Sequence, residues 1–495
     1  TMSPALAMAL LCALLAPAPG QHTDAVLRLP KDVLSDALAG SLQQGHVLQG
    51  AFGELPLGSG RPGTDGSGDL LGGLLGGLLG GGGGGGLLAT ARGVPALSPR
   101  CPCRLRIVDL TLPRVSLRLL PGIGLQLNLY TRVALNGKSV LGLLDIAVEV
   151  NVTSRIRLTM DSVGCPRLVT ERCDTLLGGI KVRLLRGLLP IVDNLLANVL
   201  NRLLPNLLCP VVDVALGLVN EKLGLVNSLV PLGLLGSIQY TVSSLPLVTG
   251  QFLEVDLNTV IGRVAGGLGD YPLGKPESVR TPPRVPMPPL PPMADTSSSQ
   301  LGLSVNFLHA VLAVLQQDGA LDLDITSGMF PELPPLTTST LGVLVPAVFK
   351  AYPEPRELLL KIAVPEAPVV TLERNKGVIQ LPATAEVMVI FPGGIQEFLC
   401  LLNIDASLLA QFSVRDNKLK IGVSLEEAGL SLVSSSIGGF DVSPLETLIG
   451  RIFNVAFLPA VNSVLGAGVP LPRMLNVDFT DANIDIVKVS VWGPP

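Results

Sequence analysis

Histidines and cysteines are the residues of this chain best suited to catalysis or metal binding. His22, His46 and His309 are the three histidines, and none belongs to a His-Glu-x-x-His zinc pattern. The chain lacks a Gly-x-Ser-x-Gly turn to present a nucleophilic serine. It also lacks a Cys-x-x-Cys pair to supply thiolate ligands. We therefore expect no enzyme, no metal and no cofactor, and we interpret His309 as a packed residue of an apolar helix.

The N-terminus and the cysteines indicate a secreted protein. Residues 1–20 resemble a signal peptide, with an apolar core at 5–16 and small residues at 18–20, where a signal peptidase would cut; an uncleaved anchor is the alternative. Because Thr1 precedes Met2, the true N-terminus stays open. We expect six of the seven cysteines to remain after cleavage, enough for one or two disulfides in an oxidising compartment. Asn151 begins the clear glycosylation motif Asn-Val-Thr, so we expect an extracellular glycoprotein.

The apolar part of the composition is aliphatic. Hydrophobic residues make up 48% of the chain, whereas aromatic residues make up 3% and charged residues 15%. A membrane-spanning helix needs about 20 mainly apolar residues. The longest uncharged run, 223–253, is broken by Pro231 and Pro246, so we expect no transmembrane segment after the signal. Aliphatic surface in this excess favours the binding of an apolar ligand.

Positive charge is concentrated in one region. The net charge is −4, but residues 100–202 contain 15 basic and 7 acidic residues. These basic residues are not interleaved with aromatic side chains that could stack on bases, so we expect no nucleic-acid partner. They either form a face that recognises anionic surfaces or are simply solvated. The residues of this candidate basic face are Arg104, Arg106, Arg114, Arg118, Arg155 and Arg157.

Two kinds of periodicity follow each other in the first half of the chain. Residues 31–43 have the spacing of a short amphipathic helix. Residues 125–135 and 146–158 alternate between apolar and polar, which is typical of a twisted antiparallel sheet with one buried face. Residues 188–207 then carry a wide leucine stripe with helical spacing. We expect Pro190, Pro205 and Pro210 to kink or segment this helix, and a Cys173–Cys209 disulfide, if it forms, would tie the helix to the preceding strand.

The second half repeats this order of elements. A helix is predicted near 303–315, strands at 358–364, 369–373 and 386–390, a hairpin turning at Asp416-Asn417, a long helix at 445–465 and a closing strand within 475–491. We place a signal peptide at 1–20 and a first unit at 21–270, which contains a flexible Gly-rich loop at 58–93. A Pro-rich linker follows at 271–300, and a second unit at 301–495.

Four segments resemble the long PLUNC members of the bactericidal/permeability-increasing (BPI) superfamily. They are LPRVSL at 112–117, RCDTLLGG at 172–179, LLCPVVD at 207–213 and GALDLDIT at 319–326. The resemblance implies an α+β fold of two tandem barrels joined by a central sheet in a boomerang. Each barrel would be a twisted antiparallel sheet around a long helix. It also implies a Cys173–Cys209 disulfide, whereas Cys101, Cys103, Cys165 and Cys400 lie outside the family pattern and their pairing stays open.

The functional expectation is lipid binding. The resemblance implies apolar barrel pockets for phospholipid or another small hydrophobic ligand, in a secreted carrier or innate-defence protein of mucosal secretions. The alternatives are an odorant carrier of nasal mucus, and a protein that recognises lipopolysaccharide or microbial surfaces through residues 100–202. The candidate side chains either line pockets or fill solid cores. They are Leu34, Leu38, Leu196, Val199 and Leu203 in the first unit, and Leu308, Val311, Leu312, Ile449 and Ile452 in the second.

Overall fold

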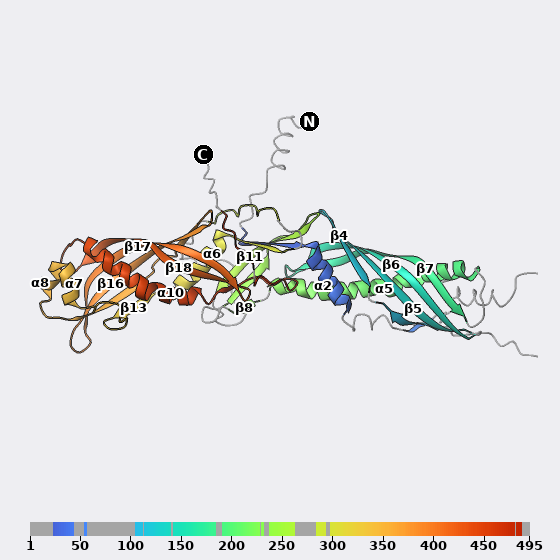
Figure 1. Ribbon diagram of the computed structural model, residues 1–495, viewed down its shortest axis with the longest axis horizontal. Helices are drawn as coiled ribbons and strands as arrows, with labels where there is room; N and C mark the ends of the chain where they lie inside the picture. Colours follow the sequence, from blue (N-terminus) through green and yellow to red (C-terminus); the bar gives the residue numbers. More distant parts are fainter. Residues whose placement is uncertain are drawn as a thin grey trace, which may run out of the picture.

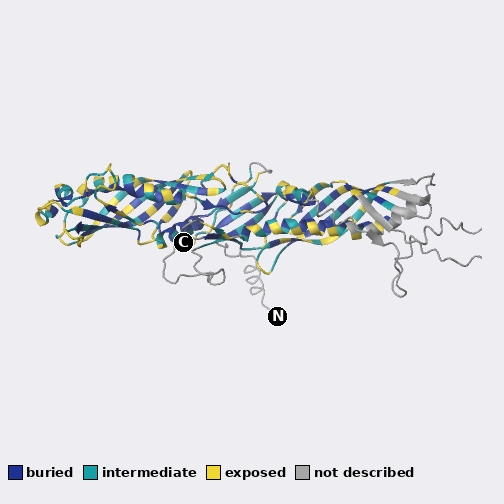
Figure 2. Cartoon of the chain, turned by 90° about the horizontal axis from the view of Figure 1, so that it is seen from below, coloured by how far each residue is buried: buried dark blue, intermediate teal, exposed yellow. Residues whose placement is uncertain are grey.

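The computed structural model shows an elongated molecule with a sheet-and-helix unit at each end and a third sheet between them (Figure 1). It describes residues 23–43, 54–56, 104–111, 113–139, 142–184, 191–227, 229–231, 237–262, 284–293, 298–480 and 482–487. The predicted signal peptide, the Gly-rich loop, Cys101 and Cys103 lie outside these residues. Buried residues occur along the described parts of both units (Figure 2).

The first unit is a six-stranded antiparallel sheet in the order β2-β3-β5-β6-β7, with β4 paired to β5. The strands are β2 (Glu54–Pro56), β3 (Arg104–Leu110), β4 (Arg114–Leu120), β5 (Gly124–Ser139), β6 (Gly142–Met160) and β7 (Pro166–Leu184). The predicted alternation is confirmed, since the odd residues of 125–135 and the even residues of 146–158 are buried. Helices α2 (Lys31–Gln43) and α5 (Ile191–Gly224) pack against this sheet.

The second unit is a seven-stranded sheet with helices packed against it and at its end (Figure 1). Its strands are β13 (Leu323–Thr326), β14 (Glu357–Ala363), β15 (Val369–Glu373), β16 (Lys376–Ile390), β17 (Gln396–Arg415), β18 (Lys418–Ser435) and β19 (Val469–Pro470). Its helices are α6 (Val305–Gln317), α7 (Thr338–Leu344), α8 (Pro346–Ala351), η4 (Ser443–Leu445), α9 (Glu446–Ile452), the π-helix η5 (Phe453–Phe457) and α10 (Leu458–Leu465). The predicted turn joins β17 to β18, with positive φ at Asp416 and Asn417 as a two-residue hairpin requires.

The central sheet joins strands from distant parts of the chain. Its order is β12 (Gln300–Leu303), β1 (Ala25–Pro30), β11 (Phe252–Gly262), β9 (Ser237–Val242) and β8 (Leu229–Pro231), with β10 (Leu247–Val248) paired to β11. Residues 284–293 of the predicted linker pack against this sheet. A Cβ on Gly302 of β12 would lie only 2.2 Å from Cδ2 of Leu290, so glycine is required at this approach. The domain boundaries themselves stay a prediction.

We expected prolines to kink or segment the leucine-rich helix. Segmentation is wrong, because α5 runs unbroken through Pro205 and Pro210, whereas a kink stays a prediction. A proline removes one helical hydrogen bond, and the burial of neighbours such as Leu204 and Leu208 offsets that loss. The predicted closing strand is also absent from the described part of 475–491. Positive φ angles at Leu475 and Asn476 turn the chain out of the extended conformation there.

The predicted disulfide is confirmed. Cys173 of β7 and Cys209 of α5 are bonded, with 36 residues between their positions in the sequence. Closing a loop of this length stabilises the folded state by about 3–4 kcal/mol in the chain-entropy model. Cys165 and Cys400 are free thiols.

One asparagine in each unit fixes the helix to the edge of the sheet. Asn220 of α5 accepts a hydrogen bond from the backbone N–H of Leu168 at 2.7 Å and donates to the carbonyl of the same residue at 3.0 Å. Asn462 of α10 binds Val423 of β18 in the same way, at 2.7 and 2.9 Å. Leu168 of β7 and Val423 of β18 each lie at a place where no further strand pairs with the outer side of their strand. The two side chains therefore satisfy edge groups that would otherwise stay unpaired.

His309 of α6 plays a similar part at β15. The backbone N–H of Val370 donates to Nε2 of His309 at 2.8 Å, so the imidazole acts as an acceptor and is neutral. Burial lowers the pKa of His309, and the nearby Val370 carbonyl opposes this shift in part. The histidine is thus a packed residue with a structural hydrogen bond.

The segment 443–465 is long and apolar enough to cross a membrane, judged by its length and composition alone. In the structure 44% of its apolar window is buried, and Leu445, Ile449 and Ile452 face the protein interior. Core helices of globular proteins often meet the same criteria, so we describe this segment as a core helix.

Replacing Asn462 with alanine should lower the free energy of unfolding by about 1–3 kcal/mol, since it leaves a backbone N–H and a carbonyl of Val423 without partners. The matched control is Asn454→Ala on the exposed face of η5, which should change the value by less than about 0.5 kcal/mol. Urea unfolding measures both. Equal stability of the two variants would contradict this role for Asn462.

Stability should fall as the pH drops below the ordinary histidine value of 6.5. Because the pKa of His309 is depressed in the folded state, the unfolded chain takes up a proton at a higher pH than the folded chain does. Lowering the pH through this range therefore favours unfolding. His309→Gln keeps a neutral acceptor for Val370 and should flatten this dependence between about pH 7 and pH 5. Urea unfolding across that range is the measurement, and an unchanged slope in the variant would reject the assignment.

Candidate ligand-binding pocket

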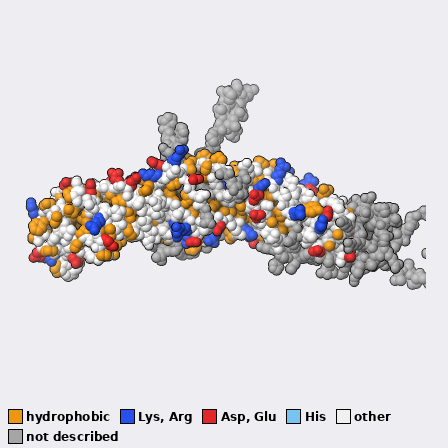
Figure 3. All heavy atoms as spheres, in the orientation of Figure 1, with side chains coloured by type: hydrophobic (Ala, Val, Ile, Leu, Met, Phe, Trp, Pro, Cys, Tyr) orange, Lys and Arg blue, Asp and Glu red, His pale blue; other side chains and the backbone are white. Residues whose placement is uncertain are grey.

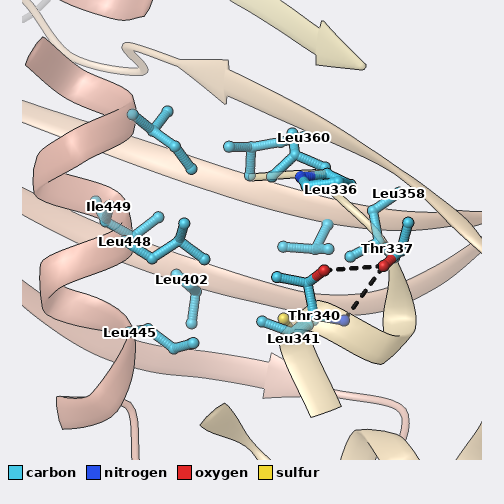
Figure 4. A pocket seen from close by; sticks show the side chains of 14 residues that line it. Leu336, Thr337, Thr340, Leu341, Leu358, Leu360, Leu402, Leu445, Leu448 and Ile449 are labelled. Atoms are coloured by element: carbon cyan, nitrogen blue, oxygen red, sulfur yellow. Dashed lines mark hydrogen bonds between the residues drawn. The ribbon is translucent and has the colours of Figure 1, made fainter. Parts of the chain in front are cut away.

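An apolar pocket lies inside the second unit, between the sheet and its helices (Figure 4). The empty space among its lining side chains, including the open mouth, is about 520 Å³, and its enclosed part admits only a slender guest. Three layers of the fold form the walls. The lining residues are Pro335, Leu336, Thr337, Thr340 and Leu341 on one side, Leu358, Leu360, Val387, Cys400 and Leu402 from the sheet, and Leu445, Leu448, Ile449 and Ile452 on the helical side.

Regular spacing explains how each element presents its apolar side chains. Leu358 and Leu360 are two residues apart on β14, as are Cys400 and Leu402 on β17, so each pair faces the same side of the sheet. On the helical side, Leu445 and Ile449 are four residues apart, and so are Leu448 and Ile452. This spacing places them on one helical face.

The polar atoms of the pocket are already engaged or uncharged. Thr337 is the N-cap of α7, and its hydroxyl accepts a hydrogen bond from the backbone N–H of Thr340 at 3.2 Å. The hydroxyls of Thr337 and Thr340 also lie 3.0 Å apart, joined by the dashed line in Figure 4. Burial raises the pKa of Cys400 to about 12, so its thiol is protonated at neutral pH. Such a wall is suited to a hydrocarbon chain and offers no charge to an ionic group.

The candidate lining residues lie in several places. Ile449 and Ile452 line the pocket. Leu308, Val311 and Leu312 are buried on α6, outside the pocket lining. Leu34 and Leu38 are fully buried on α2. The side chains of Leu196, Val199 and Leu203 lie outside the described part of α5.

Sequence reasoning missed most of the pocket wall. It named no residue of α7 and none of the strand residues that form the floor. Residues 358–360 are three consecutive leucines and all three are buried, so no alternation marks Leu358 and Leu360 as the pocket face. Nothing local marks residues 335–341 as a wall, since their role depends on the distant helix that they face.

A row of arginines crosses the outer face of the first sheet. The strand register aligns Arg118, Gln126, Arg155 and Arg172 on β4 to β7. Glu171 lies 3.8 Å from Arg155 and 3.4 Å from Arg157, so one carboxylate partly neutralises two guanidinium groups. Arg114 and Arg118 are exposed, and neither forms an ion pair with a described residue. The side chains of Arg104 and Arg106 lie outside the described set.

The exposed face also carries the predicted glycosylation residue. Asn151 of β6 is half-buried, and the register places it between Tyr130 of β5 and Leu176 of β7. Tyr130 and Leu176 are 42% and 69% exposed, so the surroundings of Asn151 are open to solvent. Its glycosylation stays a prediction.

Among the described residues no group of three or more histidine, cysteine or acidic side chains is arranged to hold a metal ion. The free thiol of Cys165 is half-buried and accepts a hydrogen bond from the amide of Asn227 at 3.3 Å. Desolvation is the main cause of the raised pKa of Cys165. Neither free cysteine therefore has the depressed pKa that marks a reactive thiol.

Several known proteins are similar to this chain. Human BPI fold-containing family B member 4 is 57% identical over 404 residues, which cover 81% of this chain and 64% of that relative, so the chain spans less than two thirds of its length. Mouse BPI fold-containing family B member 3 is 41% identical over 94% of this chain and 93% of its own. The crystal structure of lipopolysaccharide binding protein is 19% identical, with a TM-score of 0.48, over 91% of this chain and 93% of that one.

Two family descriptions match the chain in sequence order. Residues 100–224 match the N-terminal domain of the LBP / BPI / CETP family, and residues 236–490 match its C-terminal domain. The second match alone covers more than half of the chain. Together the two matches cover β3 to β7 and α5 of the first unit, the whole second unit, and β9 to β12 of the central sheet. The chain therefore belongs to the LBP / BPI / CETP family, with its lipid-binding α+β fold of two tandem domains.

Proposed function

We propose that this protein is a secreted lipid carrier that holds a single acyl chain, of a phospholipid or of another small apolar ligand, in the pocket of its second unit. The observation that supports this proposal most strongly is the lining. It combines aliphatic side chains from β14, β16, β17, α7 and α9 with two threonine hydroxyls that already bond each other. The headgroup of such a ligand would remain outside, where water solvates it.

Burial of hydrocarbon supplies enough affinity for this role. Each buried methylene contributes about 0.8 kcal/mol, so about fifteen of them contribute about 12 kcal/mol. The loss of translational and rotational freedom on binding costs at least about 4 kcal/mol, so about 8 kcal/mol remains, which corresponds to a dissociation constant near 1 μM. Specific polar contacts are therefore unnecessary, and selectivity depends on chain length and shape. A carrier for odorants in nasal mucus would use the same chemistry with a smaller guest.

Secretion fits the covalent structure. The Cys173–Cys209 bond is stable in an oxidising compartment and rare in the cytosol. A carrier or innate-defence role in mucosal secretions, without enzymatic activity, agrees with the lipid-binding fold of the family. Neither role requires a cofactor.

Substitution of Ile449 tests the pocket in two directions. Ile449→Trp should fill the space and reduce co-purified lipid several-fold, whereas Ile449→Ala should enlarge the pocket and retain lipid or accept longer chains. Native mass spectrometry, followed by lipid extraction, measures the content. Circular dichroism of both variants confirms that the fold is kept. Wild-type protein without lipid, or a tryptophan variant loaded like wild type, would contradict the proposal.

A second function is favoured by the exposed arginines. Arg114 and Arg118 form no ion pair with a described residue, and they lie on the same face of the sheet as Arg155 and Arg172. We call these four residues the arginine face. Such a face would bind the phosphate groups of lipopolysaccharide or of an anionic microbial surface. Its affinity would fall with salt, because the Debye length at physiological ionic strength is about 8 Å.

The double variant Arg114→Ser with Arg118→Ser tests this function. Each basic residue near an anionic surface contributes about 1 kcal/mol, so capture of lipopolysaccharide should weaken about 30-fold at low salt. Arg415→Ser, an exposed arginine of the second unit, is the matched control and should have little effect. Capture that is insensitive to both salt and the double substitution would exclude the arginine face.

A further inference from the structure

Helix α7 separates the apolar pocket from the outside of the molecule. Thr340 and Leu341 line the pocket, whereas Val343 is 82% exposed and is the most exposed large apolar side chain of the described residues. Leu341 and Val343 are two residues apart, which in an α-helix places them about 200° apart around the axis. One face of α7 is therefore a pocket wall, and the opposite face carries an apolar side chain in water.

Helix α8 adds a second exposed apolar side chain to the same end. Val348 is fully buried and anchors the helix, while the adjacent Phe349 is 57% exposed. A Cβ on Gly342 of α7 would lie 3.0 Å from Cβ of Phe349, so the two short helices are in close contact. We call residues 338–351 the α7–α8 cap. It forms the far end of the second unit in Figure 1, and Figure 3 shows hydrophobic side chains at that end beside both basic and acidic ones.

The charge around the cap is small. Lys350 is the single charged residue of the cap itself. In the adjoining chain Arg356 pairs with Glu354, and the nearby acids Glu332 and Glu357 are accompanied by Arg451, which donates a hydrogen bond to the carbonyl of Glu332. The cap thus lacks the excess of positive charge found on the arginine face, and an anionic surface would gain little from it. Exposed Val and Phe side chains on a nearly neutral surface fit a zwitterionic lipid layer.

We propose that the α7–α8 cap inserts Val343 and Phe349 into the surface of a zwitterionic lipid layer, and that an acyl chain reaches the pocket from this contact. The second clause rests on the proposed function. Because α7 is a wall of the pocket, a chain leaving the layer passes only this helix and need not cross open water. The contact is distinct from the arginine face, which lies on the other unit and depends on charge.

Binding of the full-length chain to phosphatidylcholine vesicles tests the contact. The wild type should co-sediment with the vesicles equally at low and high salt. The double variant Val343→Ser with Phe349→Ser should bind about tenfold more weakly or worse, because it removes two buried apolar side chains from the contact. Val163→Ser is the matched control, since Val163 is 77% exposed in the turn between β6 and β7 of the other unit. It should bind like wild type, and all variants should keep the same melting temperature.

The outcomes separate this inference from the proposed function. If the wild type does not bind the vesicles, or if the double variant binds them equally well, the proposed lipid contact of the cap is wrong. This holds even when native mass spectrometry shows lipid in the pocket. Binding that requires the cap, with a pocket empty of lipid, supports the contact and rejects the proposed function. A wild-type dimer that the double variant converts to a monomer, with no change in vesicle binding, identifies the cap as a contact between copies and overturns the lipid surface.

Discussion

The closure of an open sheet edge by a helix is the constraint on which the rest of this fold depends. In a twisted sheet that curves around a helix, the edge strand next to the helix has no neighbouring strand on its outer side. The backbone groups on that side must find other hydrogen-bond partners. Asn220 and Asn462 each supply one acceptor and one donor to a single strand residue. These paired bonds hold the helix at a fixed height over the sheet. The first unit adds the Cys173–Cys209 bond, and the second adds the bond between His309 and Val370.

The fixed position of the second helix explains why part of the interior is hollow. Asn462 anchors α10, and the chain between α9 and α10 forms a π-helix in which the rings of Phe453 and Phe457 lie 4.7 Å apart. These rings are fully buried and fill the interior next to α10. At α9 the inward side chains are leucine and isoleucine, which are too small to fill the space above β14 and β17. The pocket lies where the aromatic side chains end.

The central sheet makes the two units one structure. Strand β1, from the start of the chain, lies between β11 and β12, which flank the Pro-rich segment in sequence. The hydroxyl of Tyr240 donates to the carbonyl of Pro470 at 2.6 Å, and burial raises the pKa of this tyrosine, so it remains a donor at any physiological pH. Five of the ten residues 284–293 are prolines, which have no backbone N–H to pair with a neighbouring strand, and this segment instead packs on β12. The arginine face thus lies on the first unit, whereas the apolar pocket and the exposed cap share helix α7 of the second unit.

The sequence by itself determined the elements whose periodicity is local. Residues 31–43 form α2 as predicted, and the alternation at 125–135 and 146–158 identified the buried face of the first sheet, because burial on one side imposes a period of two. Tertiary structure alone decided how the elements are spaced. Asn220 and Asn462 find partners 52 and 39 residues away, and α7 becomes a pocket wall only opposite α9. Periodicity shows which side chains avoid water. Whether these buried side chains pack against one another or leave a pocket depends on the distances between helices and strands, which long-range contacts determine.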